Sequence, residues 1–365
     1  MKAMEILKKL SLGILIISSW FICSCSDPIY PAVDSSEQIL VVDGIISNAD
    51  TVYTINLTYA NPYNSNNVTN PISNASVWIT DNLADKYLLN ETSAGLYQTQ
   101  SKNFIGTIGR TYTLHIVTAD GTIYQSAPQV MEQPLPIDSV YGIVLNKQFL
   151  VDDGLGDGGT TTVYEQGVES YLNIPKLNNN LSNFRFQTNL VIETTCTGTV
   201  PRNPLAFPFY AWKTIDLDNI INIAPNNSGN STMDVFDHDL DFYALNIYKY
   251  YYVPDSQTLY NYIVTIQEYA INNDTYNFYS EMNQQLSAGN QLFDPIVTQV
   301  QGNITCISNS SKKALGFFQA SAVDTFTYIV QPNVGQGNVI YQKTTNMGNF
   351  PLSGIVAEMP PSFWR

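Results

Sequence analysis

Charged side chains are scarce in this 365-residue chain, where Asp, Glu, Lys and Arg together make up 13% of the residues. Soluble domains typically carry roughly 25%. Lys and Arg number 16 against 31 Asp and Glu, which gives a formal net charge of −15. Nucleic-acid-binding proteins neutralise phosphates with clustered Lys and Arg, and no such cluster is present. We therefore expect no nucleic-acid partner, and no adhesion to an anionic leaflet through basic residues.

Catalytic signatures are also lacking. The chain has two histidines, and it contains no Gly-x-Ser-x-Gly elbow, no His-Glu-x-x-His and no phosphate-binding glycine loop. His115 falls in an alternating strand pattern, which favours a partly buried structural histidine over a base. Glu165, Glu169 and Glu193 are formal candidates for a glycosidase pair, because such carboxylates meet only in space. We expect a non-enzymatic protein without a cofactor, with a polysaccharide hydrolase or lyase as an alternative.

The N-terminus carries an apolar run, Leu10–Ile22, behind three lysines. The run has signal-peptide length and is too short to span a bilayer as a helix. It ends in Ile22-Cys23-Ser24-Cys25, which resembles the lipobox of bacterial lipoproteins. We predict a signal peptide at 1–24 and a lipidated tether at 25–37, because lipid on Cys25 would anchor the protein at about 0.8 kcal/mol per buried CH2. The alternative is an ordinary secretory signal that is cut elsewhere.

A first β domain follows the tether. Ile39–Ile46 is short and β-branched, Val52–Thr58 alternates, and Tyr112–Val117 is followed by the turn Asp120-Gly121. Regular short strands separated by turn residues are typical of sandwiches. The sequence therefore predicts a mainly β protein whose residues 38–131 form an immunoglobulin- or transthyretin-like β-sandwich.

A proline-containing linker then leads into a second, larger β-rich domain, which we predict over 138–365. Strand signals include Phe317–Ala322 and Thr325–Val330. One amphipathic helix is expected near 272–286, where apolar residues recur at a spacing of three to four positions. Gly289 stands just past its predicted end, as is common after helices.

Aromatic residues supply the candidate binding surface. Tyr248, Tyr250 and Tyr252 would share one face of a strand, and Trp212 belongs to another aromatic-rich segment. Such rings can stack on sugars or dock onto a partner. The alternative is that they form one face of a sandwich core with their hydroxyl groups reaching solvent.

Four aspartates are weak candidates for metal ligands: Asp234, Asp237, Asp239 and Asp241. Carboxylate oxygens suit Ca²⁺, but the spacing differs from that of a known calcium loop. We interpret the segment as a solvated acidic turn and expect no metal. Cys196 and Cys306 can form a disulfide in an oxidising compartment, with two free buried thiols as the alternative.

Many short blocks along the chain resemble, in order and spacing, the domain-of-unknown-function 4249 family of Bacteroidota lipoproteins. These blocks are Leu40–Ile46, Ala75–Asp81, Gly95–Tyr97, Gly109–Ile116, Pro134–Tyr141, Phe293–Pro295, Gly302–Ile304 and Leu315–Ser321.

The resemblance implies an outer-membrane lipoprotein encoded near TonB-dependent transporters, and it supplies no catalytic residues. We therefore expect an accessory or binding component that associates with such a transporter or with an envelope ligand, either a glycan or a peptide. A fimbrial or matrix structural subunit is the alternative, because lipid-anchored sandwiches can also assemble by strand donation.

Overall fold

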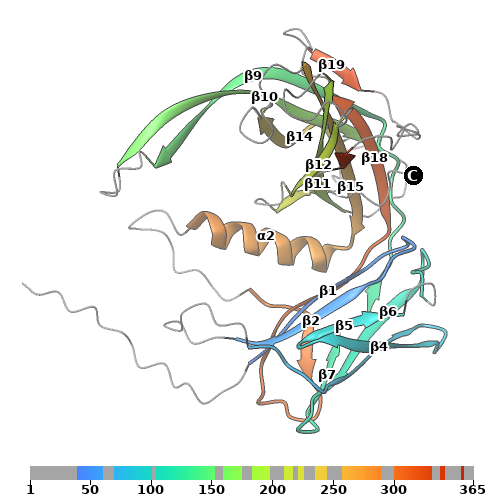
Figure 1. The fold of residues 1–365 in the computed structure, drawn as a ribbon. Coiled ribbons are helices and arrows are strands. Elements are labelled where there is room, and N and C mark those ends of the chain that lie inside the picture. Colours follow the sequence, from blue (N-terminus) through green and yellow to red (C-terminus); the bar gives the residue numbers. More distant parts are fainter. Residues whose placement is uncertain are drawn as a thin grey trace, which may run out of the picture. The chain divides into compact units, whose positions relative to one another are not determined.

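The computed structural model describes residues 39–60, 70–100, 104–152, 159–174, 183–197, 209–216, 221–225, 235–244, 257–288, 300–330, 338–341 and 355–356. The protein is mainly β, as predicted, and the described residues form three sheets and one helix (Figure 1). The predictions for residues 1–38, including Cys25, lie outside these ranges.

The first sheet has ten strands. Its path runs β16-β7-β6-β3-β4-β5-β2-β1-β17, and β8 pairs with β6. Buried residues alternate with more exposed ones along most strands, as expected for a sheet with one face on a core. The strands are β1 (Leu40–Ile46), β2 (Thr54–Tyr59), β3 (Ser76–Asp81), β4 (Lys86–Ser93), β5 (Leu96–Thr99), β6 (Thr111–Val117), β7 (Ile123–Ser126), β8 (Gln129–Val130), β16 (Ile304–Cys306) and β17 (Ala314–Ala320).

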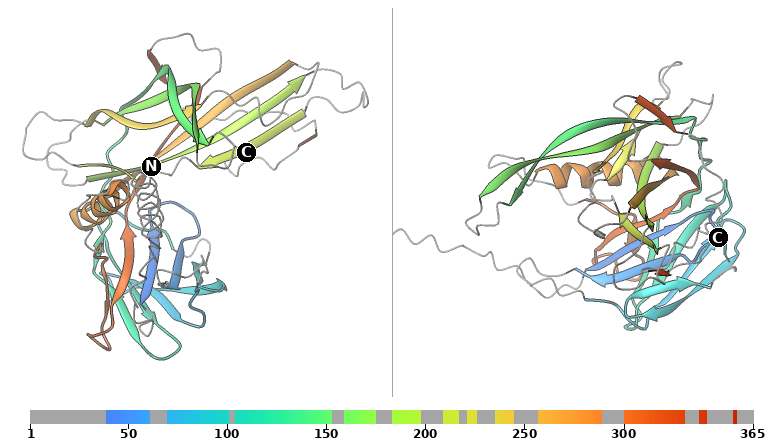
Figure 2. Two further views of the ribbon diagram at one scale, coloured as in Figure 1. Left: turned by 90° about the vertical axis from the view of Figure 1, so that its left-hand side faces the viewer. Right: turned by 45° about the horizontal axis from the view of Figure 1, so that its top comes forward.

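This sheet closes nearly on itself, so a sandwich describes it only approximately. β1 pairs in parallel with β17, and β7 pairs antiparallel with β16; Figure 2 shows β17 beside β1. The two ends of the path are tied by the Asn303 side chain. Its Nδ2 donates to the Phe318 carbonyl at 2.8 Å, and its Oδ1 accepts from the Phe318 N–H at 2.9 Å.

Two strands of the first sheet, β16 and β17, come from beyond the predicted first domain, 38–131. The core of the first sheet includes Ile304, Cys306 and Phe318, which lie in the region assigned to the second domain. Without β17, the edge of β1 would present unpaired backbone groups to solvent. Strand signals near 317–322 were recognised in the sequence, but their pairing partner, β1, was not.

Two further sheets share a second core. The four-stranded sheet has the order β14-β10-β9-β19, and the six-stranded sheet has the order β18-β15-β11-β12-β20 with β13 on β11. Val168 and Leu172 of β10 pack with Phe186, Ile266 and Phe326 of the six-stranded sheet. The strands are β9 (Ser139–Asp152), β10 (Thr160–Ile174), β11 (Asn183–Thr197), β12 (Phe209–Asp216), β13 (Asn222–Ala224), β14 (Val235–Ala244), β15 (Gln257–Ile271), β18 (Val323–Val330), β19 (Asn338–Tyr341) and β20 (Ile355–Val356).

The predicted helix is present as α2 (Asn273–Ala288). Asn272 caps its start, because its side-chain Oδ1 accepts from the Thr275 N–H at 2.9 Å. Phe278 stacks against Phe317 of β17 with ring centroids 4.6 Å apart. The helix is thus joined to the strand that completes the first sheet.

Candidate functional site

Most of the predicted site residues lie where the structure does not describe their side chains. Tyr248, Tyr250, Tyr252 and Asp234 lie outside the described residues. Trp212 is on β12, opposite Glu193 of β11.

The other three aspartates are on β14, where Asp239 is opposite Tyr171 and Asp241 is opposite Ser170 of β10. Asp237 belongs to the same strand. These three positions therefore lie in a strand, and not in the turn that was predicted. The aspartates alternate with Phe, His and Leu residues, which is a strand pattern. Leu240, between Asp239 and Asp241, is buried in the second core.

Of the two alternatives for Cys196 and Cys306, a bridge or free thiols, the bridge is not formed in this structure. Cys306 is a free, buried thiol on β16, and its Sγ lies 3.6 Å from Ser308 Oγ. Cys196 is on β11, in a different sheet, opposite Phe209. For Cys306, the alternative of a free buried thiol applies.

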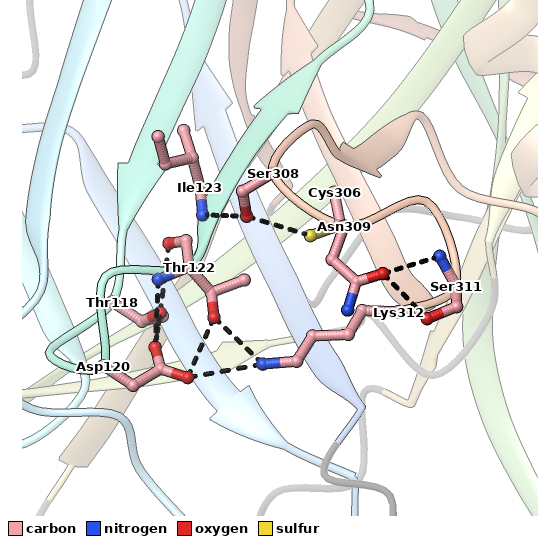
Figure 3. Close-up of polar contacts among 9 residues, drawn as sticks. All are labelled: Thr118, Asp120, Thr122, Ile123, Cys306, Ser308, Asn309, Ser311 and Lys312. Atoms are coloured by element: carbon pink, nitrogen blue, oxygen red, sulfur yellow. Dashed lines mark hydrogen bonds and ion pairs between the residues drawn. The ribbon is translucent and has the colours of Figure 1, made fainter.

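A polar cluster around Asp120 fastens the β6–β7 turn to the loop between β16 and β17 (Figure 3). The Asp120 carboxylate accepts from Thr118, from Thr122 and from Lys312 Nζ, and these hydrogen bonds hold its pKa well below the ordinary range. Ser308 Oγ accepts from the Ile123 N–H at 2.9 Å. The cluster therefore secures the strands that close the first sheet.

His115 has the structural surroundings that its strand position predicted. Its ring stacks on Trp78, with centroids 5.2 Å apart, and its Nε2 lies 2.8 Å from Thr80 Oγ1. Lys86 Nζ lies 4.3 Å from the Trp78 ring centroid. Desolvation, and then the positive charge of Lys86, lowers the pKa of His115 and so favours the neutral imidazole.

Sequence reasoning missed Arg185, which β11 places beneath helix α2. Its guanidinium carbon lies 4.9 Å from the Tyr279 ring centroid and 5.4 Å from that of Tyr269. Its buried Nη1 makes no hydrogen bond to a described residue. Tyr279 OH donates to Gln319 Oε1 of β17 at 2.9 Å. Contacts with two aromatic rings compensate this cation.

Glu268 is the most unusual side chain that the structure describes. It is 0% exposed, and neither carboxyl oxygen has a hydrogen-bond partner among the described residues. The Leu135 backbone lies close enough to the carboxyl to lower its pKa, against the larger effect of burial. Burial raises the pKa of Glu268 to about 9, and the negative charge of Asp324 adds to the rise.

The strand register explains the position of Glu268. It stands on β15, between Phe186 of β11 and Asp324 of β18, on the face that packs into the second core. The sequence analysis did not place Glu268 in the core. The sequence did carry one signal: Glu268 falls on the same face of the strand as the apolar residues Val264 and Ile266.

The described residues hold neither a metal-ligand cluster nor a membrane-spanning helix. No group of three or more His, Cys, Asp or Glu side chains in the described ranges is arranged to hold a metal ion. Within the same ranges, no helix has the length and apolar character needed to cross a membrane.

Comparison with known proteins identifies the family. No curated protein and no solved structure matches the chain. A family model described as a domain of unknown function, DUF4249, matches residues 26–327, which is more than half of the chain. The family suspected from the short sequence blocks is thereby confirmed: the chain belongs to the DUF4249 family.

Proposed function

We propose that this protein is a non-enzymatic lipoprotein of the outer membrane and an accessory or binding component of a TonB-dependent transporter or of an envelope ligand. One observation carries the proposal. The family match begins at residue 26, directly after Cys25 of the lipobox-like segment. A leader that ends at residue 24 would thus leave the whole family domain in the mature protein, behind a lipidated cysteine.

The composition and fold support a binding role. The chain carries 24 tyrosines and few charged residues, which suits an extracytoplasmic β protein that meets glycans or other proteins. Helix α2 and the first sheet are joined by hydrogen bonds from Asn272 to Gln129 and from Tyr279 to Gln319. A ligand surface on either part would therefore have a firm support.

The fimbrial alternative is less well supported by the sheet topology. A subunit that accepts a donated strand needs an unpaired edge in its sheet. In this chain β17 pairs with β1 along seven positions, from Leu40 opposite Ala314 to Ile46 opposite Ala320. Strand exchange at this position would first have to break that pairing.

Affinity purification from detergent-solubilised membranes of the native host tests the proposal. The tagged wild-type chain should retain a transporter in stoichiometric amount, or a glycan or peptide that mass spectrometry identifies. The Cys25→Ala variant, which cannot be lipidated, should reach the membrane poorly and retain much less. Recovery of the wild-type chain with neither transporter nor ligand would contradict the proposal.

A further inference from the structure

The β9–β10 hairpin extends well beyond the strands that support it. β14 pairs with β10 over Gly167–Ile174, and β19 pairs with β9 over Val140–Ile143. The outer part of the hairpin, 146–152 paired with 160–166, has no third strand beside it among the described residues. We call this part the arm, and Figure 1 shows it running past β14 and β19.

The arm exposes large apolar side chains on both of its faces. Leu150 is 70% exposed and Tyr164 is 71% exposed. Leu150 is opposite Thr162, two residues before Tyr164, so the two large side chains are diagonal neighbours on one face. Val151 is 39% exposed and is on the other face, because successive side chains of a strand alternate.

An arm of this kind is expected to be covered by another molecule. A two-stranded hairpin without further support is only marginally stable in water. Exposed apolar side chains that gather on one element mark interaction sites. The inner half of the same hairpin shows the contrast, since Val168 and Leu172 are 0% exposed in the second core. The arm has the same apolar character without a core of its own.

Charge decides which kind of molecule fits the arm. The sequence between Lys147 and Lys176 contains no basic residue. Its acidic residues are Asp152, Asp153, Asp157, Glu165 and Glu169. Lys147, at the base of the arm, pairs with Glu169 at 3.1 Å. The arm is therefore acidic as well as apolar.

Like charges disfavour two of the possible occupants. A second copy would bring this acidic segment against a chain whose own net charge is −15. An anionic lipid surface would repel the arm in the same way. A protein surface that carries basic residues around an apolar centre would instead attract it.

We propose that the arm is a docking surface for a second protein that presents an apolar groove bordered by Lys and Arg side chains. Leu150 and Tyr164 enter the groove, and the acidic residues meet its basic border. Interfaces commonly combine an apolar centre, in which Tyr is enriched, with a polar rim. The inference rests on the proposed function, to which it adds the surface that holds the partner and the chemistry of that partner.

Photo-crosslinking in membranes of the native host tests the docking surface. One full-length variant carries p-benzoylphenylalanine in place of Leu150. The control carries it in place of Leu286 of α2, an apolar side chain that is 64% exposed. The Leu150 position should give one dominant adduct with a different protein, crosslinked beside Lys or Arg residues, and the control should give little of it.

The other crosslinking outcomes contradict the proposal. A dominant adduct of twice the mass of the chain would identify a second copy, and a dominant lipid adduct would identify the membrane. A crosslinked protein surface without neighbouring basic residues would exclude the stated partner. Equal yields from the two positions would show that the arm is not the preferred contact.

Serine variants measure how much the arm contributes. Leu150→Ser and Tyr164→Ser should each retain at least about tenfold less partner, as expected for anchors near the centre of an interface. Leu286→Ser makes the same change elsewhere and should retain as much as the wild type. All three should keep the wild-type unfolding midpoint, because the changed side chains are exposed.

Retention also separates this inference from the proposed function. Equal retention by the wild type and both arm variants would overturn the docking surface and leave the proposed function intact. A wild-type chain that retains a glycan or peptide but no protein would have the same consequence. A wild-type chain that retains nothing would overturn both.

Salt tests the role of charge. Raising NaCl from about 0.1 M to about 1 M shortens the screening length from about 10 Å to about 3 Å. Retention of the partner should fall, because attraction between the acidic arm and a basic border would be screened. Retention that is unchanged or higher at 1 M NaCl would contradict a partner with a basic border.

Discussion

Adding one methyl group at Gly316 should separate the two strands that close the first sheet. Gly316 is on β17, opposite Val42 of β1, and its φ of +86° is in the left-handed region. A Cβ atom built there would lie 1.9 Å from the Val42 carbonyl oxygen. Real Cβ atoms do not approach a backbone atom so closely, so β17 would have to move away from β1 in the Gly316→Ala variant.

Gly109 provides a matched control. Its φ is +82°, and a Cβ atom there would meet nothing within 4 Å. Both variants place an alanine in the left-handed backbone region, which costs about 1–2 kcal/mol. Gly316→Ala also loses β1–β17 hydrogen bonds, at about 0.5–1.5 kcal/mol each. It loosens Phe318 as well, whose full burial contributes about 1.5–3 kcal/mol. The free energy of unfolding should therefore fall by at least about 2 kcal/mol more in Gly316→Ala than in Gly109→Ala.

Urea unfolding, followed by tryptophan fluorescence, measures this difference through linear extrapolation. Trp78 lies on β3 of the same sheet and reports on it. If the two variants lost the same free energy of unfolding, to within about 0.5 kcal/mol, β17 would not be an integral strand of the first sheet. Residues 300–322 would then not belong to the N-terminal core.

Three further predictions concern the first sheet and the predicted binding surface. The pKa of His115 is lowered in the folded state, so the unfolded chain takes up a proton first as pH falls through about 6.5, and the free energy of unfolding should decrease from pH 7 to pH 5. The His115→Gln variant should show a smaller decrease when urea unfolding is measured across this range. An unchanged decrease would exclude His115 as its source. Lys312→Ala should cost less than about 1 kcal/mol, because both partners of its ion pair with Asp120 are exposed; a much larger loss would mean that the Figure 3 cluster depends on this lysine. Changing Tyr248, Tyr250 and Tyr252 to alanine should abolish retention of the partner or ligand without loss of stability; lost stability with unchanged retention would instead assign these residues to the core.

Local patterns in the sequence predicted most of the elements that depend on nearby residues. The alternation in Val52–Thr58 became β2, and the apolar spacing between Tyr276 and Leu286 became α2. These predictions succeeded because side-chain periodicity reports which face of an element is buried. The Asp120-Gly121 turn succeeded for a similar reason, since Gly121 has a φ of +81°.

Contacts between distant residues were not predictable in the same way. Nothing in the alternation of β17 names β1 as its parallel neighbour, because strand pairing across more than 250 residues leaves no local pattern. Glu268 was missed because an acidic residue is ordinarily exposed. Arg185 was missed because its aromatic neighbours, Tyr269 and Tyr279, are assembled from β15 and α2.

Intact-mass and N-terminal analysis of the protein from native membranes tests the central claim most directly. We predict a mature chain that begins at Cys25 and carries covalently bound acyl chains, with the family domain from residue 26 onward intact. A mature chain that begins at another residue, or that begins at Cys25 without acyl chains, would contradict it.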